Sequence, residues 1–231
     1  MKPKWKIEDK SWEKFRELLG GLERTYGEAP GRFLGRSDDL RVVIEEFVPA
    51  FLSLNAEINL TGIRESEEFL WKHFFDSLLV LKLRPRGLLL DWGSGGGFPG
   101  IPLVFFRKFV EKREDRMILL DGRRKKIQTV KSLLSSFGDF NVDFVHGRGE
   151  EFIQGYKVDG VLMRAVAPPK EILGWVTRQR ADWFFFASKD QLSEWKTLEP
   201  QFGERGLRLL RILEEALPFS YGERKILHFS G

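Results

Sequence analysis

The 231-residue chain contains no cysteine and only three histidines. The absence of cysteine excludes a disulfide framework, a thiolate metal site and a cysteine nucleophile, and it favours a reducing compartment such as the cytoplasm. The three histidines, His73, His146 and His228, are scattered and lack the spacing of metal ligands. We therefore expect a site without metal.

The sequence also lacks the patterns of a membrane span and of a secretory signal. Residues 87–106 carry a single charge, on Asp91, but glycines and two prolines divide this stretch into a short strand, a turn and the start of a helix. The first ten residues carry charges where a signal peptide would have an apolar core. We expect a cytoplasmic protein with no membrane partner.

The composition is that of a packed globular protein, with 42% hydrophobic and 31% charged residues. Thirty-eight lysines and arginines exceed 34 aspartates and glutamates, which gives a net charge of +4. This excess permits a nucleic-acid partner and does not prove one. No internal repeat or low-complexity linker interrupts the chain.

Helical patterns come first in the chain, and strands alternating with helices follow. Apolar residues recur at helical spacing in residues 12–22, 40–51 and about 66–81. Strands are expected at 88–92, 117–121, 142–146, 158–163, 183–187, 207–213 and 225–229. This order predicts an α/β fold with a mostly parallel, doubly wound sheet of seven strands. We expect residues 1–84 to form a helical extension packed on a ligand-binding domain of residues 85–231.

The segment LLLDWGSGGGFPGIP at 88–102 is the most informative in the chain. An acid at the end of an apolar run is followed by glycines at alternate positions, in the order Asp91, Gly93, Gly95 and Gly97. Such glycines allow a sharp turn and a close approach of ligand to backbone, and we expect a Cβ at Gly95 to clash with backbone or ligand. The spacing also fits the G-x-G-x-x-G turn of NAD-binding proteins, and a simple strand-to-helix turn is the plainer alternative.

Asp91 favours S-adenosylmethionine over NAD at this turn. A carboxylate would repel a pyrophosphate, whereas it would pair with the ammonium group of a methionine-like cofactor.

Asp121 ends the second expected strand, where such folds place an acid that accepts hydrogen bonds from a ribose. The alternative is a helix N-cap for the segment that begins at Gly122. Four cations follow, and because they oppose the helix dipole they do not serve helix stability. Solvated surface, RNA phosphate contact and binding of a 2′-phosphate all remain open for Arg123, Arg124, Lys125 and Lys126.

Several motifs in collinear order resemble the RsmG family, also called glucose-inhibited division protein B. They are DWGSGGGFPGIPL at the glycine turn, NLTGIRESEEFLWKHFFDSL at 59–78, HGRGEEF at 146–152 and MRAVAP at 163–168. The similarity runs from about residue 40 to 189, and returns weakly at 222–224. It implies a seven-stranded, Rossmann-like class I methyltransferase that acts with S-adenosylmethionine on N7 of a guanine in small-subunit (16S) ribosomal RNA. It also implies a cytoplasmic monomer.

The resemblance assigns site residues to this chain wherever its motifs match those of the family. Its implied cofactor-site residues lie after the first four strands: Gly93, Phe98, Asp121, Gly122, Arg123, Gly149, Glu150 and Arg164. Ser94 stands where the family often has threonine and keeps the hydroxyl group, so it joins Asp91 and Gly95 in the expected site. Ser188, Lys189 and Asp190 replace the usual Leu-Lys-Gly, which leaves Lys189 without an assigned role.

The chemistry of guanine N7 limits what the enzyme must supply. N7 presents a lone pair without a proton, so no general base is required, and catalysis reduces to positioning and electrostatics. Arg164 could stack on the target base, or form a salt bridge to Asp91 or Glu150. His73 and Asp76, one helical turn apart, could face the substrate or pair on the helix surface. Asn59 and Thr61 could brace the cleft, although capping of the following helix is the stronger expectation.

Two other functions compete with RNA methylation. An NAD(P)-dependent oxidoreductase would use the same turn, and a non-catalytic assembly factor would bind the cofactor without turnover. The sequence does not name the modified guanine, the oligomeric state or the role of residues 1–37, and it does not distinguish naked RNA from a small-subunit ribonucleoprotein as substrate.

Overall fold

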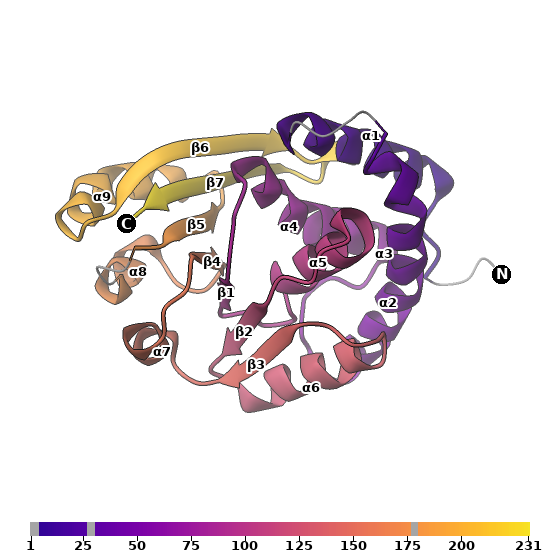
Figure 1. The fold of residues 1–231 in the computed structure, drawn as a ribbon, viewed down its shortest axis with the longest axis horizontal. Coiled ribbons are helices and arrows are strands. Elements are labelled where there is room, and N and C mark those ends of the chain that lie inside the picture. The colour runs from indigo at the N-terminus through magenta and orange to yellow at the C-terminus, as the bar shows by residue number, and fades with distance from the viewer. Residues whose placement is uncertain (1–4, 27–30, 177–179) are drawn as a thin grey trace.

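The computed structural model describes residues 5–26, 31–176 and 180–231. Its centre is a seven-stranded sheet in the order β3-β2-β1-β4-β5-β7-β6 (Figure 1). Strands β1 to β5 are parallel, and β7 runs antiparallel to both β5 and β6. The strands are β1 (Leu89–Trp92), β2 (Met117–Asp121), β3 (Val142–His146), β4 (Gly160–Arg164), β5 (Asp182–Ala187), β6 (Arg208–Ala216) and β7 (Glu223–Ser230). The predicted doubly wound α/β fold is confirmed.

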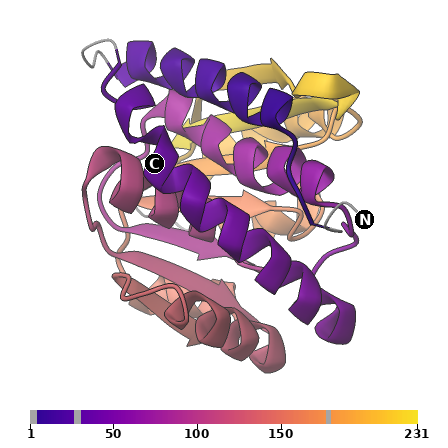
Figure 2. The same ribbon diagram turned by 90° about the vertical axis from the view of Figure 1, so that its right-hand side faces the viewer.

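The N-terminal helices cover one face of this sheet together with the helices that follow β1 and β2 (Figure 2). The N-terminal helices are α1 (Asp9–Tyr26), η1 (Leu34–Arg36) and α2 (Ser37–Ile58). The helices after β1 and β2 are α5 (Gly100–Phe105), η4 (Phe106–Glu111) and α6 (Arg124–Ser135). The opposite face carries α7 (Gly149–Gly155), α8 (Pro169–Trp175) and α9 (Leu192–Glu204) (Figure 1). A short η5 (Pro218–Ser220) joins β6 to β7.

The helix expected at about 66–81 is a continuous helical segment with changing hydrogen-bond patterns. It runs through α3 (Ser66–Phe69), a π-helical turn η2 (Leu70–Phe75), α4 (Asp76–Leu78) and a 3-10 turn η3 (Leu79–Leu83). π-helical turns inside α-helices are often associated with functional sites. Here the turn carries His73 and directly precedes Asp76.

Alternate residues of the central strands divide between two hydrophobic cores. Leu89 and Leu119 belong to the larger core, on the side of the N-terminal helices, while Leu90 and Ile118 belong to the other. The larger core contains side chains from α1 and α2 as well as from the sheet. The N-terminal helices are thus continuous with the sheet in packing, and the division at residue 84 stays a prediction.

None of the described helices is long and apolar enough to cross a membrane.

Candidate cofactor cleft

A cleft of about 450 Å³ lies over the carboxyl ends of β1 to β4. This is the edge of a parallel sheet where ligands of doubly wound folds bind. Six of the residues predicted for the cofactor site line it: Gly93, Asp121, Gly122, Arg123, Gly149 and Glu150. A slightly larger cavity of about 510 Å³ lies along the outer edge of β3, and none of the predicted site residues lines it.

The glycine turn is fixed to β2 by its backbone. Amide groups of Gly93 and Ser94 both donate to the carbonyl oxygen of Leu120, at 2.8 and 2.9 Å. Gly93 has φ +75°, and a Cβ there would lie 2.8 Å from Cγ2 of Val166. The turn can therefore approach the end of β4 only because residue 93 is a glycine.

Within the protein itself the tight position of the turn is Gly97 and not Gly95, so the expected clash of a Gly95 Cβ with backbone was wrong, and a clash with a bound ligand stays a prediction. A Cβ at Gly95 would have its nearest described contact at 3.8 Å, with φ +56°. A Cβ at Gly97 would lie 2.5 Å from Cδ1 of Ile101, with φ +91°. Substitution at Gly95 is thus strained by conformation alone, and substitution at Gly97 by conformation and by contact.

Asp91 lies beneath the turn and does not line the cleft. Its side chain is fully buried, and Oδ2 accepts a hydrogen bond from the amide of Gly100 at 2.8 Å. Oδ1 has no hydrogen-bond partner among the described residues. Burial raises the pKa of Asp91 to about 7, although the Gly100 amide and the charge of Arg164 favour the carboxylate. The expected pairing with a cofactor ammonium stays a prediction.

Asp121 binds the glycine turn and its own loop. Oδ2 accepts a hydrogen bond from the amide of Gly95 at 2.8 Å, and Oδ1 accepts one from the amide of Arg123 at 2.7 Å. The alternative of a helix N-cap was wrong, because α6 begins at Arg124 and its N-cap residue is Arg123. The role expected for Asp121, to accept hydrogen bonds from the hydroxyl groups of a ribose, stays a prediction.

Two tryptophans form an apolar wall that the sequence reasoning missed. The rings of Trp92 and Trp175 stack with centroids 5.8 Å apart and planes 17° apart, and both residues line the cleft. Gly149 packs directly against Trp92, since a Cβ there would lie 2.0 Å from Cε2 of the indole. Such a wall suits a purine ring. Other lining residues not predicted are Leu120, Gly147, Arg148, Ala165 and Val166.

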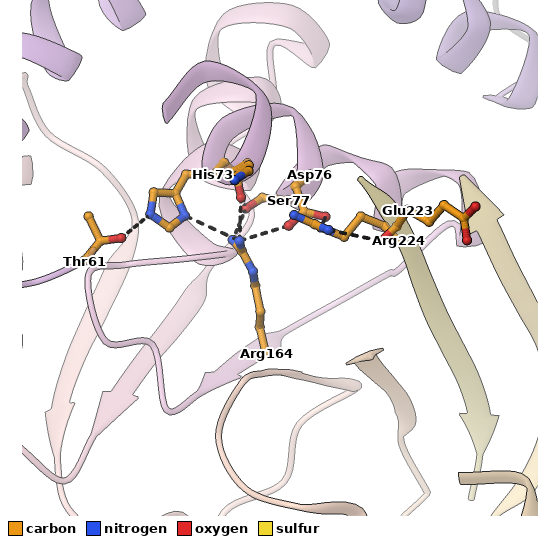
Figure 3. A network of polar contacts seen from close by, with 8 residues as sticks. Thr61, His73, Asp76, Ser77, Arg164, Glu223 and Arg224 are labelled. Atoms are coloured by element: carbon orange, nitrogen blue, oxygen red, sulfur yellow. Dashed lines mark hydrogen bonds and ion pairs between the residues drawn. The ribbon is translucent and has the colours of Figure 1, made fainter. Parts of the chain in front are cut away.

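Arg164 does not line the cleft, and its side chain points toward the helical segment 66–83, which packs with α1 and α2 in one helical layer (Figure 3). The expected salt bridge to Asp91 or Glu150 was wrong: Nη2 lies 2.9 Å from Oδ2 of Asp76. The same guanidinium donates to the carbonyl oxygen of Lys72 and lies 3.4 Å from Oγ of Ser77.

His73 is held by contacts on both ring nitrogens and on one ring face. Nε2 lies 2.7 Å from Oγ1 of Thr61, and Nδ1 lies 3.4 Å from Nη2 of Arg164 (Figure 3). The ring stacks on Phe98, with centroids 4.3 Å apart and planes 5° apart. Burial, with the charges of Arg164, Arg224 and Lys72, holds the pKa of His73 well below its usual value. His73 is therefore neutral at physiological pH.

The capping roles expected for Asn59 and Thr61 were wrong. Residue 65, a glutamate, is the N-cap of α3, and Asn59 is the C-cap of α2 with φ 54°. Thr61 instead braces His73 through its hydroxyl group.

Comparison with known proteins identifies this arrangement. A family model described as rRNA small subunit methyltransferase G matches residues 42–216. The chain belongs to this family. It is 32% identical to ribosomal RNA small subunit methyltransferase G of Histophilus somni (strain 129Pt) over 75% of this chain and 78% of that protein. It is 31% identical to the Shewanella piezotolerans protein of the same name, over 84% of this chain and 90% of that protein.

Solved structures of methyltransferases share the fold. A SAM dependent methyltransferase from Aquifex aeolicus has a TM-score of 0.51 at 16% identity, covering 71% of this chain and 93% of the other. TrmK of M. capricolum, solved with S-adenosylhomocysteine, has a TM-score of 0.52 at 12% identity. The match covers 68% of this chain and 67% of TrmK. The predicted class I methyltransferase fold is confirmed.

This family member is thus a methyltransferase whose cofactor is S-adenosylmethionine, and the oxidoreductase alternative is set aside. The residues present fit that cofactor. The turn holds two buried polar atoms without a hydrogen-bond partner in the described part of the chain, Oδ1 of Asp91 and Oγ of Ser94. Buried polar atoms in native proteins are normally paired, so both indicate a site that a ligand or water completes. The described residues contain no group of three or more His, Asp or Glu side chains placed to hold a metal ion.

Proposed function

We propose that this methyltransferase transfers a methyl group to N7 of a guanine in small-subunit ribosomal RNA. The observation that carries this proposal is the family match over residues 42–216, which includes every residue that lines the cleft. The family name supplies the RNA substrate, and the resemblance of the motifs to the RsmG family implies the guanine N7 target.

S-adenosylmethionine supplies the electrophilic methyl group when it is bound. The residues we assign to the cofactor site lie at or just after the ends of β1 to β4, and Asp91 and Arg164 contribute to it without lining the cleft. The assigned residues are Asp91, Gly93, Ser94, Gly95, Phe98, Asp121, Gly122, Arg123, Gly149, Glu150 and Arg164. Trp92 and Trp175 complete the set as apolar walls for the adenine.

Methylation at N7 requires no proton acceptor in the protein. The bond between sulfur and the methyl carbon breaks as the N7 lone pair forms the new bond, so positive charge passes from sulfur to the purine. The role of the chain is to hold N7 in line and to exclude water. This agrees with the state of His73, which is neutral and has both ring nitrogens engaged.

The rim of the cleft carries the charge that RNA phosphates need. Arg123, which lines the cleft, has a side chain 68% exposed, and Arg124 and Lys125 beside it are also exposed. Contacts to phosphates supply most sequence-independent affinity for RNA. A target base inside a stack cannot reach the cofactor, so we expect it to be unstacked before transfer.

The decisive experiment compares ribosomal RNA from cells with and without this protein. We expect one guanine of the small-subunit RNA to lose its N7 methyl group in the deletion strain and to regain it on complementation. Methylation at another atom, or in another RNA, would contradict the proposal. Complementation by a Gly97→Ala variant, which distorts the turn, should leave that guanine unmethylated. Methyl transfer by the purified protein to RNA from the deletion strain distinguishes an enzyme from an assembly factor that acts without turnover.

We further infer that the protein acts in the cytoplasm as a monomer. The absence of cysteine and the place where ribosomal RNA is processed support the compartment. Size-exclusion chromatography with light scattering tests the monomer.

A further inference from the structure

The carboxylate of Asp76 lies between two arginines that come from different strands. Arg164 ends β4 and Arg224 belongs to β7, whereas Asp76 begins α4 in the helical layer. Oδ2 of Asp76 is 2.9 Å from Nη2 of Arg164, and Oδ1 is 3.1 Å from Nε of Arg224 (Figure 3). The side chain of Asp76 is 1% exposed, so the two arginines are needed to compensate a buried negative charge. We call these three residues the Asp76 cluster.

One connection from the Asp76 cluster to the cleft runs through the backbone after Arg164. The next residue, Ala165, lines the cleft with φ +52°, a conformation that side chains with a Cβ rarely adopt. Val166 follows and packs against Gly93 of the glycine turn. A strained residue persists only where neighbouring contacts determine its conformation. The bound guanidinium of Arg164 provides such a contact immediately before Ala165.

A second connection runs through His73 to the other side of the same turn. The guanidinium of Arg164 lies 3.4 Å from Nδ1 of His73, whose ring stacks on Phe98. Phe98 ends the glycine turn, five residues after Gly93. The Asp76 cluster is therefore connected indirectly to both ends of the turn. Val166 links it to Gly93, and His73 links it to Phe98.

We propose that Asp76, Arg164 and Arg224 are positioning residues that set the affinity of the cleft for S-adenosylmethionine. They do so by fixing Ala165 and the glycine turn, without touching the cofactor. Since Asp76 belongs to the helical layer and Arg224 to β7, packing of the helical layer and of β7 determines the shape of a cleft built on β1 to β4. The inference rests on the proposed function only for the identity of the ligand.

The test is the affinity for S-adenosylhomocysteine, measured by calorimetry on the full chain without RNA. Asp76→Asn keeps the shape of the side chain and removes its charge, which leaves two arginines uncompensated. We expect the Kd to rise by at least about tenfold, because small displacements of positioning groups cost binding and rate steeply. In the methylation assay the KM for S-adenosylmethionine should rise by a similar factor, with kcat at saturating cofactor changed less.

Glu215→Gln is the matched control. Glu215 forms an ion pair with Lys82, which also joins the helical layer to the C-terminal strands, but no contact among the described residues connects that pair to the turn. Both variants should unfold at lower temperature than the wild type, and only Asp76→Asn should lose affinity. The titrations are made well below both melting temperatures.

An Asp76→Asn protein that melts earlier yet binds S-adenosylhomocysteine as the wild type does would overturn the proposal. Should this variant not fold, Arg224→Gln removes the most exposed member of the cluster and gives the same comparison. Because the titration needs no RNA, its result is independent of which nucleotide is methylated.

Discussion

Asp91 is expected to make the stability of the free protein depend on pH. Burial raises its pKa from 3.8 to about 7 in the folded state, and the charge of Asp121 adds to this. A carboxyl group with a raised pKa binds its proton more tightly in the folded than in the unfolded chain. Its contribution to stability is therefore fully present below about pH 4 and is lost progressively as the pH rises to about 7.

The size of this effect follows from the shift in pKa. The difference between about 7 and 3.8 is about 3 units. At about 1.4 kcal/mol for each unit, ionisation of Asp91 removes about 4 kcal/mol of stability between these pH values. Because the side chain is fully buried, solvent screening does not reduce the figure.

Asp91→Asn isolates this contribution. An asparagine keeps the oxygen that accepts from the Gly100 amide and carries no charge at any pH. We expect the difference in unfolding free energy between variant and wild type to favour the variant by about 4 kcal/mol more at pH 7.5 than at about pH 4. Urea unfolding at a series of pH values measures it. Equal differences at both ends of the range would refute a buried, protonated Asp91.

Three further predictions concern the turn, the rim and His73. Gly97→Ala should destabilise the protein by about 2 to 4 kcal/mol in urea unfolding, and Gly95→Ala by only about 1, because only the former adds a steric contact to its strain. Equal losses would contradict the geometry of the turn. Charge reversal at Arg123, Arg124 and Lys125 should weaken RNA binding and reduce its salt dependence by up to about 2 in log–log slope; an unchanged slope would make these residues solvated surface. His73→Ala should lower single-turnover methyl transfer without changing its pH profile between about pH 6 and 9. A wild-type rate that rises tenfold per pH unit and loses this rise in the variant would instead identify His73 as a base.

The strands could be predicted from sequence because their signals are local. Residues 117–121 and 142–146 coincide with β2 and β3, since each is a short apolar or alternating run bounded by polar residues and turns. The helical segment at 66–81 was predicted as helix, but its π and 3-10 turns were not. Hydrophobic spacing reports which residues face the core, and it does not report whether a carbonyl bonds three, four or five residues ahead.

The residues of the site that lie in local sequence motifs could be predicted, and those defined by long-range contacts could not. Gly93 and Asp121 were found because each lies in a strand-to-loop motif with a chemical signature. Trp175 carries no such signal, since an aromatic residue at the end of a helix more often belongs to the core. The partner of Arg164 could not be found either, because Asp76 meets Arg164 and Arg224 only after the sheet has brought β4 and β7 beside the helical layer.

Asp91 has a role in the fold that the sequence argument did not include. The sequence argument chose S-adenosylmethionine because a carboxylate would pair with the cofactor ammonium. In the structure Oδ2 of the carboxylate also accepts a hydrogen bond from the first amide of α5, and a Cβ at Gly100 would lie 2.8 Å from this atom. The acid thus fixes where the helix begins relative to β1, and it occupies the buried end of the turn with negative charge or a proton. The ionised carboxylate disfavours a pyrophosphate at this position, so we expect it to favour a cofactor that places no phosphate at the turn.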